Sequence, residues 1–190
     1  GHNMQYMKGI DAYQNNRPTA ITLGKFDGLH QGHELLIERV EKHQLEDDVD
    51  GIVFAFDMRP FFLKLNQQPD FLLTNEEKAE KLKDRVKFFI DCPFDEKISS
   101  ICAEDFIKDI LVDKFHVRYV IVGTDFRFGY QAKGDYHMLQ DYGKQYGFQV
   151  EVITKKCYEG REISSSLIKE ELKKGNKQLV NYLLGYEYLK

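Results

Sequence analysis

Residues 18–33 decide the fold, and they read Pro-Thr-Ala-Ile-Thr-Leu-Gly-Lys-Phe-Asp-Gly-Leu-His-Gln-Gly-His. The apolar residues 18–24 predict a short buried strand that ends at Gly24. A glycine-bearing turn follows, and the helical spacing of apolar residues in 34–44 predicts a helix that begins around Gln31. A strand that runs through a tight turn into a helix is typical of the opening unit of an α/β fold.

Four more strands are expected along the chain, over residues 51–57, 88–92, 117–123 and 148–154. Helices are expected over residues 75–88, 103–115, 136–146, 166–174 and 178–184. Thr74 and Glu77 predict a capping box at the start of the first of these helices. Because strands alternate with helices, we predict the α/β class, with a Rossmann-like three-layer α/β/α architecture and a five-stranded, mainly parallel sheet.

The composition is that of a globular protein. The 190 residues suit one domain, and contents of 42% hydrophobic and 31% charged residues argue against global disorder. A formal net charge of −4 argues against a general nucleic-acid or membrane-surface binder. A site for an anionic substrate therefore has to be a local concentration of hydrogen-bond donors.

A cytoplasmic location is predicted. No apolar run approaches the roughly 20 residues of a membrane span, and the N-terminus lacks the apolar core of a signal peptide. Cys92, Cys102 and Cys157 are widely spaced, which predicts reduced and mostly buried thiols rather than disulfides. Residues 1–3 precede Met4 and are expected to be the remnant of an expression tag.

Four segments follow a predicted strand or open a predicted helix, namely residues 24–33, 57–60, 123–129 and 163–169. In open parallel sheets, ligands bind at the carboxyl ends of the strands, near the point where the strand order switches. We therefore expect these four segments to meet at one site.

His30 and His33 carry the chemistry of the first segment. They are three residues apart and share one face of the first helical turn, and Gly32 between them allows a ligand to approach closely. The N–H groups and the positive dipole end of a helix attract phosphate, so two imidazoles there could donate hydrogen bonds to a polyphosphate. The alternatives are ordinary surface histidines or a zinc site. Zinc is disfavoured because the zincin pattern spaces its histidines four apart, with Glu beside the first.

The third segment suits recognition of a nucleoside. Gly123 lets a ligand lie against the end of a strand, and Asp125 can accept hydrogen bonds from a ribose or an adenine amino group. Phe126 and Phe128 alternate on a strand-like stretch, so one ring could face the ligand and the other the core. Core packing of both rings is the alternative.

Consecutive hydroxyl groups open the last segment. Ser164, Ser165 and Ser166 stand at the start of a predicted helix, where hydroxyls and free N–H groups make a second phosphate cradle. Lys169 adds a positive charge one turn later. The alternative is a serine-capped helix with a solvated lysine.

The pattern Gly-x-Phe-Asp-Gly-x-His-x-Gly-His at residues 24–33 resembles the FAD synthetase (FMN adenylyltransferase) module of bacterial bifunctional riboflavin kinase/FAD synthetases, which belong to the HxGH nucleotidyltransferase superfamily. Residues 121–129, followed by Gly134 and Asp135, are similar to the V-V-G-x-D-F-R-F-G…G-D stretch of that family. Residues 163–169 are similar to its ISSTxIR motif.

The resemblance covers nearly all of residues 17–186 and implies the nucleotidyltransferase fold, but four positions depart from the family pattern. Met58 and Arg59 replace two residues of the family's F-D-P-H-P pattern, although a guanidinium there is also a good ligand for phosphate. Leu167 stands where flavin-type members usually carry Arg, and Ala132 stands where they usually carry a basic residue.

The resemblance implies the reaction ATP + FMN → FAD + pyrophosphate, with ATP and FMN as substrates and with Mg²⁺ held mainly by the ATP phosphates rather than by protein ligands. The implied catalytic residues are His30, His33, Ser164 and Ser165. The implied ATP-binding residues are Gly24, Lys25, Phe26, Gly32, Gly123, Asp125, Phe128, Ser166 and Lys169. The implied FMN-binding residues are Asp27, Asp57, Arg59, Phe61, Phe126 and Arg127.

The resemblance also implies one nucleotidyltransferase domain over residues 4–186, a C-terminal tail over 187–190 and no riboflavin kinase domain, which makes a separate riboflavin kinase a candidate partner. Neither nucleic acid nor a membrane is expected as a partner. Two other functions stay open. The residues at 58–59 favour a same-fold nucleotidyltransferase with another phosphorylated acceptor. Leu167, Ala132 and the altered loop at Asp57 favour a catalytically weak nucleotide- or flavin-binding module.

Overall fold

Six parallel strands form the central sheet of the computed structural model, which describes residues 3–190. Their order across the sheet is β1-β4-β3-β2-β5-β6, and each neighbouring pair is parallel. The α/β class and the parallel sheet are therefore confirmed. The strands are β1 (Gln5–Lys8), β2 (Thr19–Gly24), β3 (Asp50–Asp57), β4 (Phe88–Pro93), β5 (Val117–Gly123) and β6 (Gln149–Ile153).

The sheet has one strand more than the five that were expected. The predicted strands correspond to β2 through β6, and the sixth is the edge strand β1. Its sequence, Gln-Tyr-Met-Lys, has only partly buried or exposed side chains, so it lacks the apolar run that indicates the inner strands. Pairing with β4 is what makes it a strand. Of the expected tag remnant, residues 1–2 lie outside the described residues.

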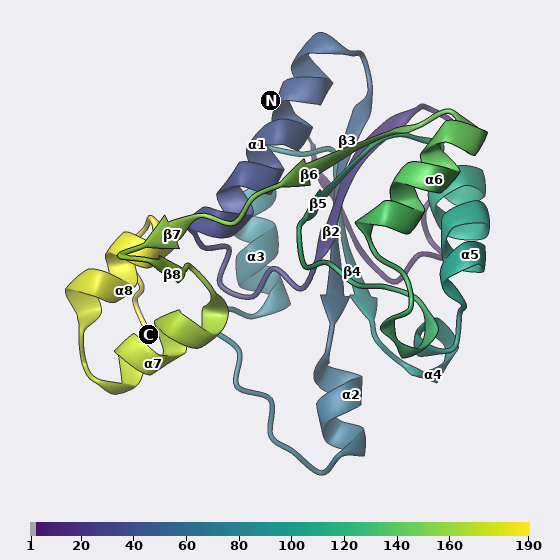
Figure 1. The fold of residues 1–190 in the computed structure, drawn as a ribbon. Coiled ribbons are helices and arrows are strands. Elements are labelled where there is room, and N and C mark those ends of the chain that lie inside the picture. The colour runs from purple at the N-terminus through teal and green to yellow at the C-terminus, as the bar shows by residue number, and fades with distance from the viewer. Residues whose placement is uncertain (1–2) are drawn as a thin grey trace.

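Helices cover both faces of the sheet, which confirms the three-layer architecture (Figure 1). One face carries α1 (Gln31–Glu46) and α3 (Asn75–Leu82). The other carries α4 (Glu96–Ser99), α5 (Ala103–Asp105), the π-helix η1 (Phe106–Lys114) and α6 (Tyr136–Tyr146). In Figure 1, helix α2 (Arg59–Lys64) projects beyond the end of β3.

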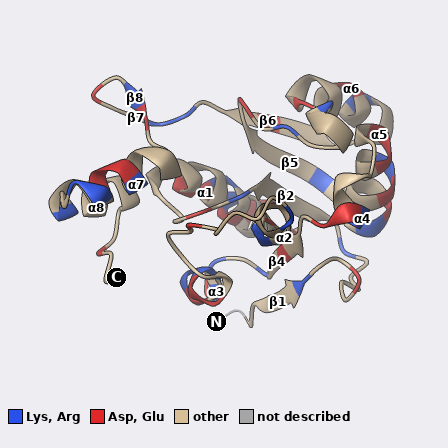
Figure 2. Cartoon of the chain, turned by 90° about the horizontal axis from the view of Figure 1, so that it is seen from below, with Lys and Arg blue, Asp and Glu red and all other residues tan. Residues whose placement is uncertain are grey.

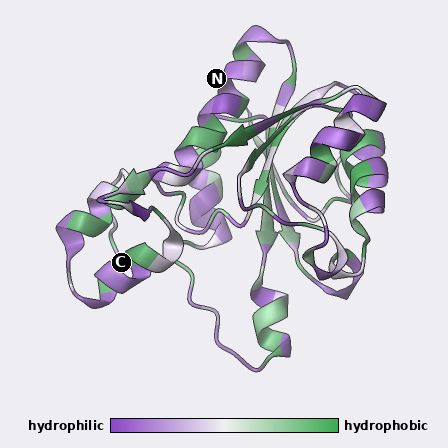
Figure 3. Cartoon of the chain, in the orientation of Figure 1, coloured by the Kyte–Doolittle hydropathy of each residue, from purple (hydrophilic) through white to green (hydrophobic). Residues whose placement is uncertain are grey.

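Alternate residues of the inner strands face two separate hydrophobic clusters. Ile21 and Leu23 of β2 are buried on the side of η1 and α6, whereas Val53 and Ala55 of β3 are buried on the side of α1 and α3. A strand that is buried on both faces needs apolar residues at every position, which explains the continuous apolar runs in the sequence. Figure 3 shows this contrast between mainly hydrophobic inner strands and helices of mixed hydropathy.

Three of the six predicted helices are confirmed within one residue at each end, namely α6, α7 (Ser165–Lys173) and α8 (Lys177–Leu184). The capping box of α3 is also present, because Thr74 and Glu77 bond each other's backbone N–H groups. However, α3 ends at Leu82 rather than at residue 88. The chain turns there because Arg85 pairs with two carboxylates of α1 and its carbonyl accepts from Gln44.

The helix predicted over residues 103–115 is present but changes its winding. From Phe106 onward it is a π-helix, and the N–H of Phe115 donates to the carbonyl oxygen of Ile110, five residues earlier. This winding is rare, and periodicity at 3.6 residues per turn does not predict it. The short helices α2, α4 and η2 (Tyr130–Ala132) were not predicted either, because segments of three to six residues carry too little periodicity.

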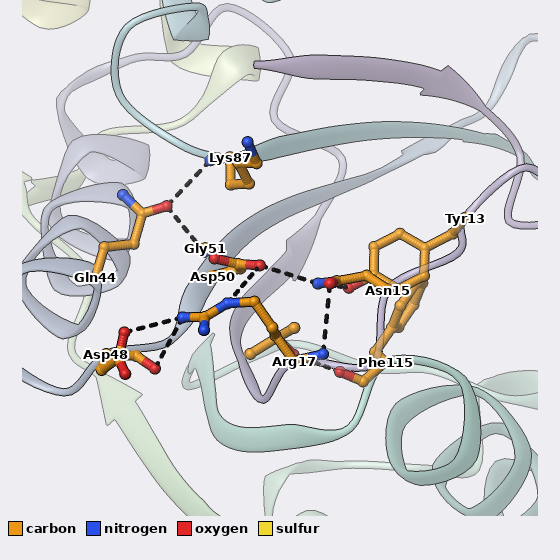
Figure 4. Close-up of polar contacts among 10 residues, drawn as sticks. Tyr13, Asn15, Arg17, Gln44, Asp48, Asp50, Gly51, Lys87 and Phe115 are labelled. Carbon is orange, nitrogen blue, oxygen red and sulfur yellow. Dashed lines mark hydrogen bonds and ion pairs between the residues drawn. The ribbon is translucent and has the colours of Figure 1, made fainter. Parts of the chain in front are cut away.

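Helix α1 is anchored against the sheet near its C-terminal end (Figure 4). The side-chain oxygen of Gln44 accepts hydrogen bonds from the N–H groups of Gly51 (2.8 Å) and Lys87 (3.0 Å). A Cβ atom at Gly51 would lie 2.3 Å from that oxygen and 2.6 Å from Cγ1 of Val40, so a larger residue there would displace Gln44. Figure 4 also shows Arg17 pairing with Asp48 and Asp50 beside the start of β3. These contacts hold α1 in a defined position, and its opposite end enters the site.

A C-terminal lobe follows β6 and consists of the antiparallel pair β7 (Cys157–Tyr158) and β8 (Arg161–Glu162) with α7 and α8. Its own cluster includes Ile163, Leu167 and Ile168. The lobe is attached to the first segment because the hydroxyl of Tyr186 donates to the carbonyl oxygen of Gly28 at 2.6 Å. Within the expected tail at 187–190, the hydroxyl of Tyr188 donates to the carbonyl oxygen of Leu72.

The expectation of mostly buried thiols is wrong. Cys92 is buried, but Cys102 and Cys157 are exposed, and all three are free. Cys102 stands at the N-cap of α5 and Cys157 lies in the short hairpin, and such element ends lie at the surface. Within residues 3–190, no helix is both long enough and apolar enough to span a membrane. Charges of both signs are spread over the helices (Figure 2).

The strand order reverses between β2 and β5. The chain runs from β2 to β3 to β4 toward one edge and then returns to place β5 on the other side of β2. In such sheets a crevice opens at the carboxyl ends of the two strands that flank the reversal. Gly24 and Gly123 end these two strands, so they mark the place where a ligand is expected.

Candidate active site

A cavity of about 1120 Å³ lies at the carboxyl ends of β2, β3 and β5. All four segments singled out in the sequence contribute to its lining, and every predicted site residue except Phe61 is part of it. Phe61 lies on α2 with an exposed side chain, and the neighbouring Phe62 lines the cavity instead. The structure thus brings together residues as far apart in the chain as Gly24 and Lys169.

His30 is the N-cap of α1, and His33 completes a reciprocal capping box. The Nδ1 atom of His30 accepts hydrogen bonds from the N–H groups of Gly32 (3.0 Å) and His33 (3.4 Å). The Nδ1 atom of His33 accepts from the N–H of His30 at 3.2 Å, and the two rings are stacked with centroids 3.6 Å apart. The helical spacing of the pair was predicted, but its capping role was not, because histidine is not among the preferred N-cap residues.

Both imidazoles are neutral at pH 7. Burial lowers the pKa of His30 to about 4, with a further contribution from the charge of Lys155. Burial also lowers the pKa of His33 well below its usual value, and His30, Lys78 and Lys155 add to the effect. Since each Nδ1 atom accepts a backbone hydrogen bond, the single proton of each neutral ring is on Nε2. Each ring therefore presents one N–H donor at the cavity.

Gly32 is required by the histidine pair itself. A Cβ atom there would lie 2.9 Å from Cε1 and 3.0 Å from Nδ1 of the His30 ring. The sequence prediction explained this glycine by the approach of a ligand, whereas the structure shows a contact within the protein. The preceding turn is also strained, since Phe26 and Leu29 have φ angles of 55° and 44°.

The N-terminus of α7 faces the same cavity as that of α1. Ser164 caps α7 by accepting from the N–H of Leu167 at 3.1 Å, so this helix does begin with a serine cap. The hydroxyl of Ser165 donates to the carbonyl oxygen of Asp27 at 2.6 Å, and Ser166 is exposed. Leu167 is buried in the C-terminal lobe, so no charged side chain at this position reaches the cavity.

Asp27 joins three parts of the site. One carboxylate oxygen accepts from the N–H of Leu72 at 2.8 Å, and the other forms an ion pair of 3.0 Å with Lys169. Its carbonyl oxygen accepts from Ser165. With these partners, Asp27 is a connecting residue between the first segment, the loop before α3, and α7.

Asp57 and Arg59 form a second polar group, at the end of β3. Asp57 accepts from the N–H of Arg59 at 3.0 Å and from the amide of Asn75 at 3.3 Å. The Arg59 guanidinium lies 5.7 Å from the ring centroid of Phe71, a distance typical of cation–π contacts. Arg59 therefore places a positive charge in the cavity where the family pattern has histidine.

The segment after β5 turns at Thr124 and Asp125, and its one strand-like residue is Phe128, which forms an antiparallel bridge with Gly134. Phe128 is buried against Phe106, and its ring lies 2.6 Å from the position of a Cβ atom on Gly134. Phe126 is only partly buried and stacks on Phe128 with centroids 5.7 Å apart. Of the two rings, Phe126 is the more accessible to a ligand.

Charged pairs surround this turn. The carboxylate of Asp125 is mostly exposed and forms an ion pair of 2.5 Å with Lys155, which also lies 3.8 Å from Glu162. Arg127 lies 4.0 Å from Asp135.

Three lysines of the cavity were missed in the sequence, namely Lys78, Lys155 and Lys156. Lys155 follows the end of β6, so the rule for strand ends would have included it. Lys78 is buried on α3, three residues after Asn75 and four before Leu82, which are also buried. That helical spacing could have shown that the lysine points inward, because residues three and four apart share one helix face.

Comparison with known proteins agrees with this geometry. A family model described as FAD synthetase matches residues 12–167. The chain belongs to the FAD synthetase family. The family is thus confirmed over most of the chain, including three of the four segments of the site in full and residues 163–167 of the fourth.

Curated relatives in this family are named bifunctional riboflavin kinase/FMN adenylyltransferase. The protein of Buchnera aphidicola subsp. Schizaphis graminum is 32% identical over 186 residues, which cover 96% of this chain and 60% of the relative. The protein of Haemophilus influenzae is 33% identical over 189 residues, which cover 97% of this chain and 61% of the relative. The chain thus spans about three-fifths of the length of these relatives.

Solved structures show the same fold. A structure described as a macrolide-efflux protein from Streptococcus pneumoniae superposes with a TM-score of 0.82 at 23% identity, over 98% of this chain and 61% of that one. Pantoate-beta-alanine ligase from Francisella tularensis, in complex with beta-gamma ATP and beta-alanine, gives a TM-score of 0.53 at 13% identity, over 95% and 86%. At these identities the likeness concerns the fold.

Proposed function

We propose that the protein transfers AMP from ATP to FMN, giving FAD and pyrophosphate. One observation carries the proposal: two helix N-termini, one of them bearing two neutral histidines, meet at a single large cavity. Helix N-termini are anion sites, and a cavity of about 1120 Å³ has room for two substrates of this size. The names of the relatives point to the same reaction.

In the proposed reaction, an oxygen of the FMN phosphate forms a bond to the α-phosphorus of ATP, and the bond from that phosphorus to the bridging oxygen of pyrophosphate breaks. The FMN phosphate is already ionised near neutral pH, so no general base is needed. Catalysis then consists of positioning and stabilisation of charge. No covalent intermediate with the protein is required.

His30 and His33 would donate their Nε2–H groups to oxygens of the phosphate chain, with His33 acting on the charge that develops in the transition state. Ser164 and Ser165 would hold phosphates at the N-terminus of α7 together with its free N–H groups, aided by Lys169. The neutral ring keeps this one donor because its Nδ1 atom accepts from the backbone and its proton is therefore on Nε2.

The nucleoside end would lie against Gly24 and Gly123, with Asp125 accepting a hydrogen bond from the ribose or the adenine. The flavin would lie toward Arg59 and Phe126, where aromatic rings and a guanidinium line the cavity. Phe62 takes the position in the lining that was expected of its neighbour on α2.

Mg²⁺ is proposed to enter as the ATP complex. Within residues 3–190, no group of three or more His, Cys, Asp and Glu side chains is arranged to hold an ion. The cavity carboxylates Asp27, Asp57 and Asp125 are paired with lysine or arginine. This donor set fits an ion that keeps phosphate and water ligands, and Mg²⁺ would supply neutralisation of phosphate charge.

The test is direct. The protein is mixed with ATP, Mg²⁺ and FMN, and FAD is followed by chromatography together with pyrophosphate release. FAD is expected in amounts equal to pyrophosphate. Absence of FAD under conditions in which ATP binds would rule out FMN as the acceptor. In the cell, FMN would be supplied by a riboflavin kinase, the other activity in the names of the relatives.

A second candidate is a transfer of AMP to another phosphorylated acceptor. Arg59, which stands outside the family pattern and lines the cavity, favours it. A screen of phosphorylated acceptors for pyrophosphate release separates the two. A third candidate is a catalytically weak binding module, which the burial of Leu167 favours. It predicts binding of ATP and FMN in calorimetry without formation of product.

The free thiols of Cys102 and Cys157 fit a reducing compartment, so we place the reaction in the cytoplasm.

A further inference from the structure

Lys78 is a buried lysine that the proposed reaction has not used so far. Lys78 is 5% exposed and lines the cavity from α3. Its Nζ atom donates to the carbonyl oxygen of Lys25 at 3.3 Å, which is its one hydrogen bond among the described residues. An ammonium group has three donors, so two of them are left without a protein acceptor.

Three carboxylates lie near this ammonium group, but none is within ion-pair distance among the described residues. Asp27, Asp57 and Asp91 all act on the lysine by their charge. Asp27 pairs with Lys169 and Asp57 with Arg59, and Asp91 accepts from the hydroxyl of Tyr6 at 3.1 Å. The three carboxylates therefore stabilise the charge of Lys78 from a distance and leave two of its three donors free.

A buried charge with free donors is costly to the fold unless a ligand compensates for it. Burial lowers the pKa of Lys78, which reflects this cost, and the three carboxylates oppose the shift. Apolar residues fill most buried positions of helices, so a lysine here needs a functional reason. The cavity that it lines offers one, because an anion there would accept its free N–H groups.

The position of Lys78 indicates which anion this is. Its charge acts on His33, which places it near the histidine pair, and its helix neighbour Asn75 bonds Asp57 at the flavin end. The lysine thus lies between the site proposed for the ATP phosphates and that proposed for the flavin. The phosphate of an acceptor has to occupy this place, because its oxygen attacks the α-phosphorus next to the histidines.

We propose that Lys78 binds the phosphate monoester of the acceptor and makes the site select a phosphorylated flavin over an unphosphorylated one. This inference rests on the proposed transfer to FMN. Lys78 brings a positive charge between two anions that repel each other, and so favours their approach. The triphosphate of ATP could also accept hydrogen bonds from Lys78, so the experiment measures FMN and ATP affinity separately.

The test compares wild type with Lys78→Met, which keeps the length of the side chain and removes the charge. Affinities for FMN, riboflavin and ATP are measured separately, by flavin fluorescence and by calorimetry. The variant is expected to lose FMN affinity by about 10- to 100-fold, the range for a hydrogen bond to a charged group. Its affinities for riboflavin and for ATP should stay unchanged, so that the preference for FMN over riboflavin collapses.

Lys81→Met is the matched control. Lys81 lies on the same helix, is exposed, and stacks over the ring of Tyr186 at 3.5 Å, away from the main cavity. Its FMN preference should equal that of wild type. Thermal unfolding checks that both variants fold, and Lys78→Gln replaces Lys78→Met should the latter not fold.

Three results would overturn the inference. An unchanged ratio of FMN to riboflavin affinity in folded Lys78→Met excludes Lys78 as a phosphate ligand of the acceptor. A loss of ATP affinity instead assigns the lysine to the nucleotide. A wild type that forms no FAD overturns the proposed function and the inference with it. If the wild type forms FAD but the ratio of FMN to riboflavin affinity is unchanged in Lys78→Met, the inference is overturned and the proposed function stands.

Discussion

The two ends of helix α1 surround histidine with opposite charges. At the N-terminus, the Nδ1 atoms of His30 and His33 accept backbone hydrogen bonds, and lysines lie nearby. At the C-terminal end, both nitrogens of His43 face carboxylates, Asp47 at 2.6 Å and Glu151 at 2.5 Å. The His43 ring is buried and stacks on Tyr119 with centroids 3.8 Å apart.

Within helix α1, the histidines at the N-terminal end therefore serve the proposed reaction, and His43 near the C-terminal end serves the stability of the fold. The contacts of His43 join α1 to β6 through Glu151, which Arg39 also holds at 2.7 Å. The histidines at the N-terminus instead keep one donor each for a ligand. We expect changes at one end to alter turnover and changes at the other to alter stability.

The largest effect is expected for His33→Ala. It removes a donor aimed at the developing charge, and such losses lower turnover by about 100- to 1,000-fold. The rate of FAD formation at saturating ATP and FMN measures this, and far-UV circular dichroism checks the fold. His137→Ala, at an exposed histidine of α6 outside the cavity, is the control. A rate near that of wild type would contradict the role given to the N-terminus of α1.

A smaller effect is expected for His43→Ala, and it concerns stability rather than turnover. Loss of the ring breaks both carboxylate contacts and the stacking on Tyr119, and should lower the free energy of unfolding by about 2 kcal/mol. This is less than for a fully buried pair, because both carboxylates are partly exposed. Urea unfolding measures the change, with the exposed neighbour Lys42→Ala as control. Turnover below about half of wild type would show that the two ends are not independent.

The last effect appears only below neutral pH, and it is a pH dependence of stability that originates at the N-terminal end. The pKa of His30 is lowered from its usual value of 6.5 to about 4, so between these values the unfolded chain binds a proton that the folded chain does not. Stability is therefore lost as the pH falls through this window, by about 1.4 kcal/mol per pH unit for this residue.

The variant His30→Asn isolates that contribution. Asparagine is a good N-cap residue, so the cap is kept while the titrating group is removed. Urea unfolding at pH 7, 6 and 5 should give a shallower pH dependence than in wild type, with similar stability at pH 7. Parallel curves for the two proteins would show that His30 stays accessible to protons in the folded state.

Local sequence patterns predicted the parts of the molecule in which neighbouring residues carry the signal. The inner strands are apolar at every position because helices cover both faces of the sheet. The cap residues Thr74 and Ser164 act within one helical turn, so their roles can be inferred from spacing. The four segments of the site were also predicted to meet, since parallel strands bring their carboxyl ends to one edge.

Features that depend on distant partners were missed. The edge strand β1 carries no apolar run and exists through its pairing with β4. Arg85 ends α3 early because its partners lie on α1. The exposed thiols of Cys102 and Cys157 follow from their places at element ends, which composition does not show.

Residue order alone therefore settles the α/β class, five of the six strands and the family, because these depend on periodicity and short motifs. The tertiary structure decides what each polar side chain does, because charge state and hydrogen bonding depend on burial and on neighbours brought from elsewhere in the chain. The neutral histidines of the cavity, His43 between its carboxylates, and Lys78 with its free donors are all products of that packing.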